Sequence, residues 1–367
     1  MLSPRMKRDI YRILPFGLIW LIFSAVYTLL EKGLLGNLTQ YPSTENPYNF
    51  SRNIVVTPAF AFVIGLLVGA IEIVYLNKLF TKKSFTSKIL LKTIIYLAII
   101  TFFLVVLAAL ANSHELQTSV FKKEVWNNTW LFLSNYAFLS VAVYMASIII
   151  VSQFYAEVSE SIGQVVLTNF FTGRYHSPKE EERIYMFLDL KSSTTIAETL
   201  GHVKYFEMLK EYYSDLSDPI IDFSGEVYQY VGDEIVVSWN LRTGLKNNSC
   251  IQCFFAIKAA IHKKSRKYKE SFGLFPEFKA GFHVGRVTIG EIGVIKKEII
   301  FTGDVLNTTA RIVGLCNSFA VDILLSGDLL RLLDPGPQYQ VKSFGECQLR
   351  GREEGVEVFT IALNPTR

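Results

Sequence analysis

Cysteine is scarce in this chain, and where it is absent matters as much as where it occurs. The 367 residues include four cysteines, at positions 250, 253, 316 and 347, so none lies in the first half. Cys250 and Cys253 are the one closely spaced pair, and no second pair follows at the spacing of a zinc site. The apolar pattern around them continues at helical spacing, which favours buried helix residues over a metal or redox centre.

The sequence also has no large excess of charge of either sign. Lysine and arginine number 37 against 33 acidic residues, a net charge of +4. No basic patch interleaved with aromatic side chains occurs, so the sequence gives no indication of a nucleic-acid partner.

Four long runs of the first half are almost free of charge, at 13–30, 54–76, 89–111 and 130–151. Each is long enough to cross a bilayer, which takes about 20 residues as a helix. Buried helices of a soluble protein are the alternative, but four such runs in succession disfavour it. Glu72 is a carboxylate within the second run, near its end, and either a structural or a sensing role fits it.

The basic residues predict how these spans are oriented. They gather before the first span and in the second connection, as Arg5, Lys7, Arg8, Arg12, Lys78, Lys82, Lys83 and Lys88. The first and third connections are nearly balanced in charge. Because positively charged loops stay in the cytoplasm, we expect both ends of a multi-pass anchor (1–153) of the cell membrane to be cytoplasmic. The basic start lacks a small-residue cleavage site, which favours an anchor over a removable signal.

A linker, 154–180, follows the last span. Phe154, Val158 and Ile162 recur at helical spacing, while Glu157 and Glu160 face away from them. This pattern predicts a continuous helix that ends near 171–173, before a polar turn with a proline. Either a coupling element or a passive tether is compatible with it.

The second half, 181–363, alternates strand and helix patterns. We expect a strand at 184–190, helices at 193–200 and 202–223, a hairpin around Asp233, a helix at 249–268, a hairpin around Gly285, a helix with Asn307 and Arg311, and strands near 322–326, 338–344 and 356–362. This order predicts an α+β domain with one mainly antiparallel sheet.

Two carboxylates stand at strand ends in this half. Asp189 closes a short apolar run, and Ser192, Ser193 and Thr194 then open a helix; Asp233 follows a glycine at a hairpin tip. Either alone is compatible with a helix cap or a turn. Together, beside a helix N-terminus, they suit divalent metal and phosphate, as in two-metal phosphoryl or nucleotidyl transfer.

A third element strengthens the functional interpretation. Asn307 and Arg311 are spaced i and i+4, on one face of a helix. An amide and a permanent cation that reach one ligand suit a ribose oxygen and a phosphate.

In this order, these motifs resemble the catalytic domain of the class III nucleotidyl cyclases, the adenylate and guanylate cyclases, over about 183–362. The resemblance implies a ferredoxin-like core and the cyclisation of a nucleoside triphosphate by its own ribose 3′-hydroxyl, with pyrophosphate as the leaving group. It also implies two Mg²⁺ or Mn²⁺ ions per active site.

The resemblance assigns the metal ligands and the catalytic pair. Asp189, Asp233 and the carbonyl of Leu190 match the metal-binding positions. Asn307 matches the residue that orients the ribose, and Arg311 matches the arginine that stabilises charge on the α-phosphate.

The remaining phosphate contacts follow in the same way. The amides of Ser192, Ser193 and Thr194 match a cradle for the triphosphate. Arg350 is the best match for a cation on the terminal phosphate, with Arg352 as the alternative.

The base-recognition positions depart from the family pattern. Gln229 stands where adenylate cyclases usually carry lysine, and Ile300 where they carry aspartate; the guanylate signature is not met either. A glutamine amide can donate to adenine or accept from guanine, and Thr302 offers a nearby hydroxyl. Since no carboxylate is present to accept guanine's donors, ATP is favoured over GTP.

The family's active site is shared between two catalytic domains, so the resemblance implies a homodimer with two equivalent sites. Three other functions remain to be considered. A diguanylate cyclase lacks the downstream Asn/Arg pair, and a membrane scaffold leaves both aspartates unexplained. A degenerate, nucleotide-binding receptor without turnover is consistent with the altered base positions.

Overall fold

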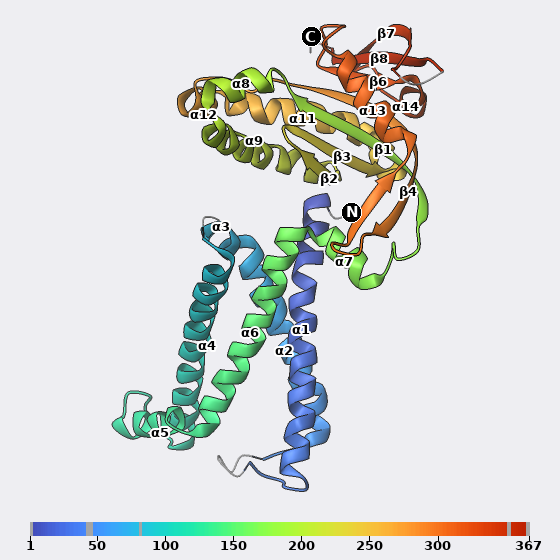
Figure 1. The fold of residues 1–367 in the computed structure, drawn as a ribbon. Helices are drawn as coiled ribbons and strands as arrows, with labels where there is room; N and C mark the ends of the chain where they lie inside the picture. Colours follow the sequence, from blue (N-terminus) through green and yellow to red (C-terminus); the bar gives the residue numbers. More distant parts are fainter. Residues whose placement is uncertain (1–2, 42–46, 81–82, 351–353, 365–367) are drawn as a thin grey trace. The chain divides into compact units, whose positions relative to one another are not determined.

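The computed structural model describes residues 3–41, 47–80, 83–350 and 354–364. The chain divides into two compact units, Met6–Thr168 and a second one made mainly of Asn169–Arg367. Figure 1 labels the helices and strands of the two units.

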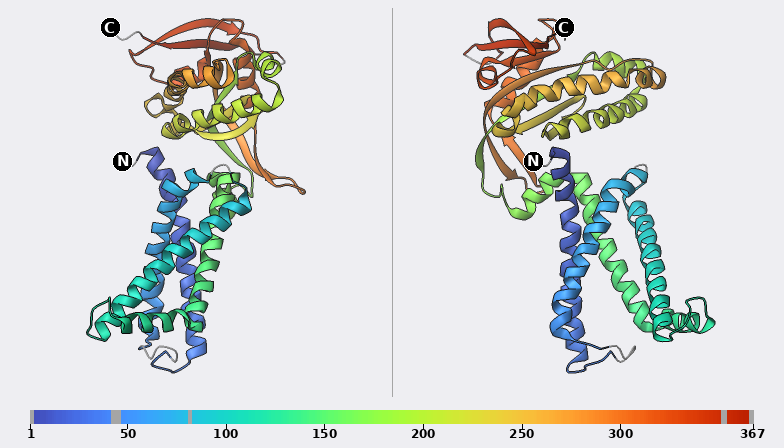
Figure 2. Two further views of the ribbon diagram at one scale, coloured as in Figure 1. Left: turned by 90° about the vertical axis from the view of Figure 1, so that its left-hand side faces the viewer. Right: turned by 180° about the vertical axis from the view of Figure 1, so that it is seen from behind.

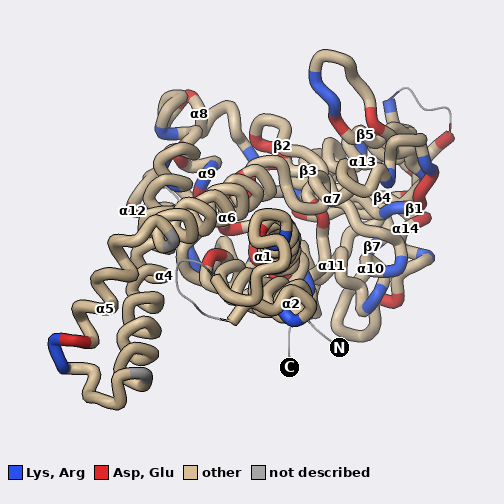
Figure 3. The backbone as a smooth tube through the Cα atoms, turned by 90° about the horizontal axis from the view of Figure 1, so that it is seen from below, with Lys and Arg blue, Asp and Glu red and all other residues tan. Residues whose placement is uncertain are grey.

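The first unit is helical. Its elements are α1 (Pro4–Leu35), α2 (Phe50–Ile71), the π-helical turn η1 (Glu72–Leu76), α3 (Asn77–Leu79), α4 (Phe85–Glu115), α5 (Lys123–Leu133) and α6 (Tyr136–Ile162). Four stretches are long and apolar enough to cross a membrane, Pro4–Leu35, Phe50–Leu76, Phe85–His114 and Phe138–Ile162. Along most of their length, α4 and α6 contain no charged residue (Figure 3).

Close packing of α1 against α2 depends on a pair of glycines spaced by four residues. A Cβ on Gly65 would lie 2.8 Å from the carbonyl oxygen of Phe16, and one on Gly69 would lie 3.0 Å from the Phe16 side chain. Small residues at this spacing let two helix backbones approach within a membrane.

The predicted fourth span begins too early. Residues 123–133 form the separate helix α5, which lies across the ends of α4 and α6 (Figures 1 and 2). The helix ends because the Ser134 hydroxyl bonds the carbonyl oxygens of Trp130 and Leu131, at 2.9 and 3.1 Å. Helix α6 therefore starts at Tyr136, and the last candidate span runs from Phe138 to Ile162.

Two predictions for the linker are wrong. The helix is not continuous, because Gly163, at φ +93°, separates α6 from α7 (Gln164–Thr172). Two of its residues also face the other way: Phe154 is 53% exposed, whereas Glu157 is 3% exposed; Glu160 is exposed, as predicted. Within a bilayer the surroundings are as apolar as the side chains, so the polar residues turn inward to find partners.

The second unit is built on one eight-stranded sheet. Its strands are β1 (Lys179–Leu190), β2 (Glu226–Val231), β3 (Glu234–Asn240), β4 (Phe278–Ile292), β5 (Glu298–Thr302), β6 (Ile323–Ser326), β7 (Tyr339–Cys347) and β8 (Val356–Leu363). Its further helical elements are α8 (Ser193–Leu200), α9 (His202–Asp222), α10 (Leu241–Leu245), η2 (Lys246–Asn248), α11 (Ser249–Lys263), α12 (Ser265–Phe272), α13 (Asp304–Leu315) and α14 (Gly327–Leu332).

The sheet order is β2-β3-β1-β4-β6-β8-β7, with β5 paired to β4. All pairings are antiparallel except that of β4 with β6. The predicted fold class, an apolar helical domain followed by an α+β domain, is confirmed.

Alternation along β1 divides the core into two layers. Ile184 and Met186 pack with α9 and α11, which lie side by side on one face (Figure 2). Tyr185 and Phe187 point to the other face, where they pack with α13. Asp189, two residues further, therefore projects on the α13 side.

The expected hairpin around Gly285 is wrong, because β4 runs without a turn from Phe278 to Ile292. The glycines of this strand serve packing instead. A Cβ on Gly281 would lie 2.5 Å from the backbone nitrogen of Val313, and one on Gly285 would lie 3.1 Å from the side chain of Val305. The helix predicted over 249–268 is also divided, into α11 and α12.

Gly281→Ala should destabilise the second unit much more than Gly285→Ala. The first substitution meets backbone atoms that cannot move independently, whereas the second meets a side chain that can adjust. We expect Tm to fall by about 5–10 °C for Gly281→Ala and by no more than about 3 °C for Gly285→Ala, from overpacking costs of about 1–3 kcal/mol. Thermal unfolding of the purified protein measures both; equal shifts would contradict the packing explanation.

Candidate active site

Asp189 lies at the end of β1, opposite Lys279 on β4. Its side chain is 26% exposed, and its Oδ2 is 3.2 Å from Nζ of Lys279, which is 10% exposed. The lysine ammonium also lies 3.4 Å from Oδ1 of Asn317, just after α13. A largely buried ion pair thus occupies the sheet face that α13 covers.

The β2–β3 turn brings Asp233 within hydrogen-bond reach of the Asp189 carboxyl group. Gly232 gives this turn its shape, because its φ of +62° is accessible mainly to glycine. The hydroxyl of Tyr213 donates to the carbonyl oxygen of Gly232 at 2.8 Å, and its ring lies 4.7 Å from that of Tyr230. Helix α9 therefore fixes the turn that carries Asp233.

Negative charge is concentrated here. Burial and the hydrogen bond to Asp233 raise the pKa of Asp189, while the neighbouring Lys279 lowers it. Burial, followed by the charges of Asp189 and Asp233, raises the pKa of Glu234 to about 7. Asp189 and Glu234 thus both respond to the charge of Asp233, with Lys279 as the cation beside them, so a bound cation would offset this negative charge.

These residues fit a divalent ion that keeps open coordination positions. In the described part of the chain, no group of three or more His, Cys, Asp or Glu side chains forms a closed metal cage. Asp189, Asp233 and the Leu190 carbonyl would leave positions for water and substrate, as Mg²⁺ prefers.

Ser192 initiates α8 in a left-handed conformation, with φ +55°. No side chain caps this helix, so neither Ser192 nor Asp189 acts as the simple cap that the sequence allowed. The amides of Ser193 and Thr194 belong to its first turn, the end of a helix that favours an anion.

Asn307 and Arg311 lie on the outer face of α13. Asn307 is exposed and Arg311 half-buried, whereas Val305, Thr309 and Ile312 of the same helix are buried. Among the described residues, no carboxylate forms an ion pair with Arg311, and neither residue contacts the two aspartates through a recorded hydrogen bond or ion pair. A single chain thus does not join the two predicted sets.

The base-recognition positions lie on β2 and β5. Tyr228 and Phe301 join these strands, with ring centroids 4.5 Å apart and the Tyr228 hydroxyl 3.3 Å from the Phe301 amide nitrogen. Gln229 and Ile300 adjoin this contact, and the Thr302 hydroxyl bonds the carbonyl oxygen of Thr288 at 3.4 Å. Gln229 is exposed and pairs with Val236 of β3, just after the register shift that falls between Val227 and Gln229.

Arg350 is exposed in the turn after β7. Arg352, the alternative terminal-phosphate cation, lies outside the described residues.

Lys279 is the residue that sequence reasoning missed. A signal for it exists, since it is a lysine inside the otherwise apolar and small-residue run 278–282. A charge in a buried strand needs a partner, and only the sheet register identifies Asp189 as that partner.

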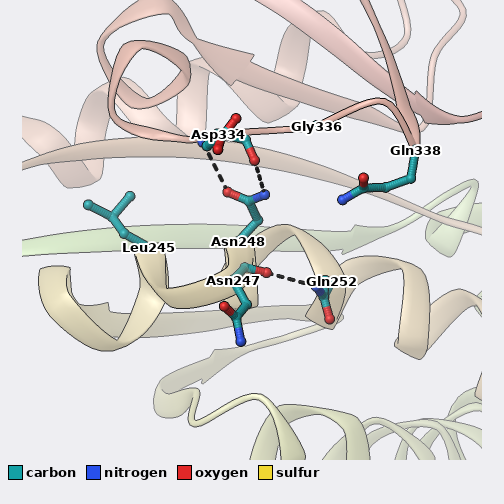
Figure 4. Close-up of a pocket in the computed structure, with 7 residues that line it drawn as sticks. All are labelled: Leu245, Asn247, Asn248, Gln252, Asp334, Gly336 and Gln338. Carbon is teal, nitrogen blue, oxygen red and sulfur yellow. Dashed lines mark hydrogen bonds between the residues drawn. The ribbon is translucent and has the colours of Figure 1, made fainter.

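A polar cavity of about 410 Å³ lies elsewhere, between the start of α11 and the segment after α14. Figure 4 shows Asn248 bonded to the backbone of Asp334, and Gln252 bonded to the carbonyl oxygen of Asn247. None of the predicted site residues lines it. Its side chains hold the start of α11 to the segment after α14.

Comparison with known proteins agrees with this fold. The structure of a bacterial light-regulated adenylyl cyclase superposes with a TM-score of 0.53 at 18% identity, covering 62% of this chain and 66% of that one. That similarity defines the fold. The model of the adenylate and guanylate cyclase catalytic domain matches residues 176–362, about half of the chain. The chain therefore belongs to the class III nucleotidyl cyclases.

Two curated relatives come from Rhizobium meliloti (strain 1021). Adenylate cyclase 2 is 35% identical over 57% of this chain, and adenylate cyclase 1 is 25% identical over 55%. The matched region spans 57% and 30% of their respective lengths.

Lys279→Met should increase the stabilisation that Mn²⁺ gives. Without the lysine, Asp189 loses its internal cation, so Tm should fall in metal-free buffer and rise further when Mn²⁺ is added. A tenfold gain in affinity corresponds to about 1.4 kcal/mol, or about 3–5 °C. Thermal unfolding with and without Mn²⁺ measures this effect.

Lys258→Met is the matched control, because Lys258 pairs with Asp322 at 2.5 Å, apart from the aspartate pair. An equal Mn²⁺ response in both variants would show that Lys279 does not compete for the metal site.

Proposed function

We propose that this protein is an adenylate cyclase, which converts ATP to cyclic AMP and pyrophosphate. The observation that carries the proposal is the Asp189–Asp233 carboxyl pair, held at a strand end beside Lys279 and the N-terminus of α8. Such a concentration of carboxylates needs cations, and a triphosphate with divalent ions supplies them.

The proposed cofactors are two Mg²⁺ or Mn²⁺ ions, held by Asp189, Asp233 and the Leu190 carbonyl. When bound, such ions lower the pKa of a substrate hydroxyl and neutralise phosphate oxygens. The mutual repulsion of the two carboxyl groups supports this assignment.

The chain's own residues bind and orient the nucleotide. The amides of Ser192, Ser193 and Thr194 would donate hydrogen bonds to the triphosphate, and Lys279 would exchange its contact with Asp189 for a phosphate oxygen once metal neutralises that carboxylate. Arg350 would contact the terminal phosphate.

Asn307 and Arg311 complete the proposed site. Asn307 would hold the ribose by hydrogen bonds so that its 3′-hydroxyl faces the α-phosphate. Arg311 would stabilise the charge that develops there, a contribution of about 3 kcal/mol or more for a well-placed donor. Its guanidinium has no carboxylate partner among the described residues, which keeps it available to an anion.

A homodimer follows from this division of labour. One chain offers the aspartates, and α13 of a second chain offers its exposed Asn307 and Arg311 across a twofold axis. Each interface would then form two equivalent sites.

The base is proposed to be adenine. The Gln229 amide can donate to adenine N1, while Ile300 offers no acceptor to guanine. The names of the two Rhizobium relatives support the same choice.

The protein is proposed to be a multi-pass membrane protein with both ends in the cytoplasm. Residues 1–153 would form the anchor, 154–180 the linker, and 181–363 the catalytic domain. The four apolar helices and the basic residues before α1 and α4 support this arrangement.

A product assay tests the reaction directly. The purified full-length protein is given ATP or GTP with Mg²⁺ or Mn²⁺, and we expect cyclic AMP from ATP and little cyclic GMP. Cyclic GMP as the main product would overturn the base assignment and leave the mechanism. No turnover by a folded dimer would favour a nucleotide-binding receptor.

Mixing two inactive variants tests the shared site. Asp189→Ala and Arg311→Ala should each lower kcat by about 100-fold or more. Coexpression should restore about a quarter of the wild-type activity at random pairing, because half of the dimers then contain one intact site of two. Asp189→Ala coexpressed with Asp233→Ala is the control. Both changes remove a residue of the aspartate pair, so every site in this mixture lacks one of the two aspartates. Activity no higher in the first mixture than in this control would refute a site shared between chains.

A further inference from the structure

A buried ion network joins three helices of the membrane unit. Lys92 on α4 places Nζ 2.5 Å from Oε1 of Glu72 and 2.9 Å from Oε1 of Glu157. The exposed fractions of the Lys92, Glu72 and Glu157 side chains are 0%, 0% and 3%. Glu72 begins the π-helical turn after α2, and Glu157 lies on α6.

Every charge in this network has its partners. The third donor of the Lys92 ammonium bonds Oδ1 of Asn77 at 2.8 Å. Oε2 of Glu72 accepts from the Tyr96 hydroxyl and from Nε2 of Gln153, both at 3.0 Å. Oε2 of Glu157 lies 3.1 Å from Nζ of Lys88. Two carboxylates and two ammonium groups balance, so the ionic part of the network is closed; among the described residues, Nδ2 of Asn77 and Oε1 of Gln153 stay buried without a hydrogen-bond partner.

Such closure depends on the rotation and register of the helices. Turning α6 by one residue, about 100°, would remove both Glu157 and Gln153 from their partners. Lys88 and Lys92 are spaced i and i+4, so both reach α6 only from one face of α4. The π-helical turn, a local irregularity often found at functional positions, sets where Glu72 points.

Stability alone does not explain a network of this kind. A buried ion pair replaced as a whole by apolar residues is often no less stable, whereas loss of one member leaves an unpaired buried charge. Apolar helices in a bilayer can slide and rotate against one another at little cost, and a polar cluster selects one arrangement.

We propose that the Glu72–Lys92–Glu157 network is a latch that fixes the rotation of α6 against α2 and α4, and so sets how the output helix presents the catalytic domains to each other. Glu157 lies five residues before the end of α6, after which the chain passes through Gly163 and α7 to β1. These three residues are positioning residues for the cyclase reaction. The kinetic part of this inference rests on the proposed function.

The test measures helix position and kinetics in the full-length protein. Spin labels are attached to cysteines introduced by Phe85→Cys on α4 and Phe154→Cys on α6. The rings of these two phenylalanines are 6.0 Å apart, and the residues are 42% and 53% exposed. The background carries Cys347→Ser, because the other three cysteines are buried.

Two variants of the network are compared. Glu157→Gln weakens it at one member. The triple variant Glu72→Leu, Lys92→Met, Glu157→Leu replaces its three most buried members with apolar side chains that are expected to fold in a bilayer, and leaves Lys88, whose side chain is 16% exposed, without its carboxylate partner. Thr28→Val is the matched control, since Thr28 is a buried polar residue of α1 that bonds the carbonyl oxygen of Ser24 in its own helix.

We expect the wild type and the control to give one narrow distribution of label distances. Both network variants should give a broadened or shifted distribution and at least a fivefold lower kcat, with KM for ATP unchanged within twofold. This pattern separates loss of alignment from loss of substrate binding.

A narrow, unshifted distribution in the triple variant would overturn the latch, whatever its activity. A shifted distribution with unchanged kcat, or with a changed KM alone, would overturn the positioning role. If the wild type makes no cyclic nucleotide, the proposed function fails, and the label distances still decide whether the network fixes α6.

Discussion

The repulsion between Asp189 and Asp233 is the constraint on which the catalytic unit depends. Two carboxyl groups within hydrogen-bond reach, partly removed from water, are stable only where the fold holds them together and something positive offsets them. Antiparallel pairing of β1 with β4 supplies Lys279, and α9 supplies the tyrosine that holds the β2–β3 turn. The site is therefore built for cations before any ligand arrives.

A second constraint comes from the close approach of α13 to the sheet. The absence of a side chain at Gly281 lets the helix backbone lie directly on β4, two residues along the strand from Lys279. With one face of α13 committed to the core, Asn307 and Arg311 remain on the other, where a partner chain can be reached. The outward position of these two residues is what supports the proposed site shared between two chains.

Local patterns made much of this predictable. A strand that ends in aspartate before a helix, and a Gly-Asp turn, are readable because each depends on a few adjacent residues. Lys279 was missed because its partner lies 90 positions away along the chain and is defined only by sheet register. Gly285 was misread as a turn because a glycine required for helix packing has the same sequence signature. Glu157 was placed on the wrong face because helical periodicity identifies two faces and does not say which one meets an apolar environment.

The two ionic clusters of the chain obey one rule with opposite results. Around Asp189, three carboxyl groups lie near one lysine; burial, followed by the charges of Asp189 and Asp233, raises the pKa of Glu234. That cluster is the proposed metal site, where Lys279 would exchange its contact with Asp189 for a phosphate oxygen. Around Lys92, two carboxylates meet two ammonium groups, and each charged atom has a recorded partner. That cluster is closed, so it gains nothing from a ligand and instead selects one arrangement of helices. The balance of charge, rather than burial itself, therefore separates a site that binds from a site that positions.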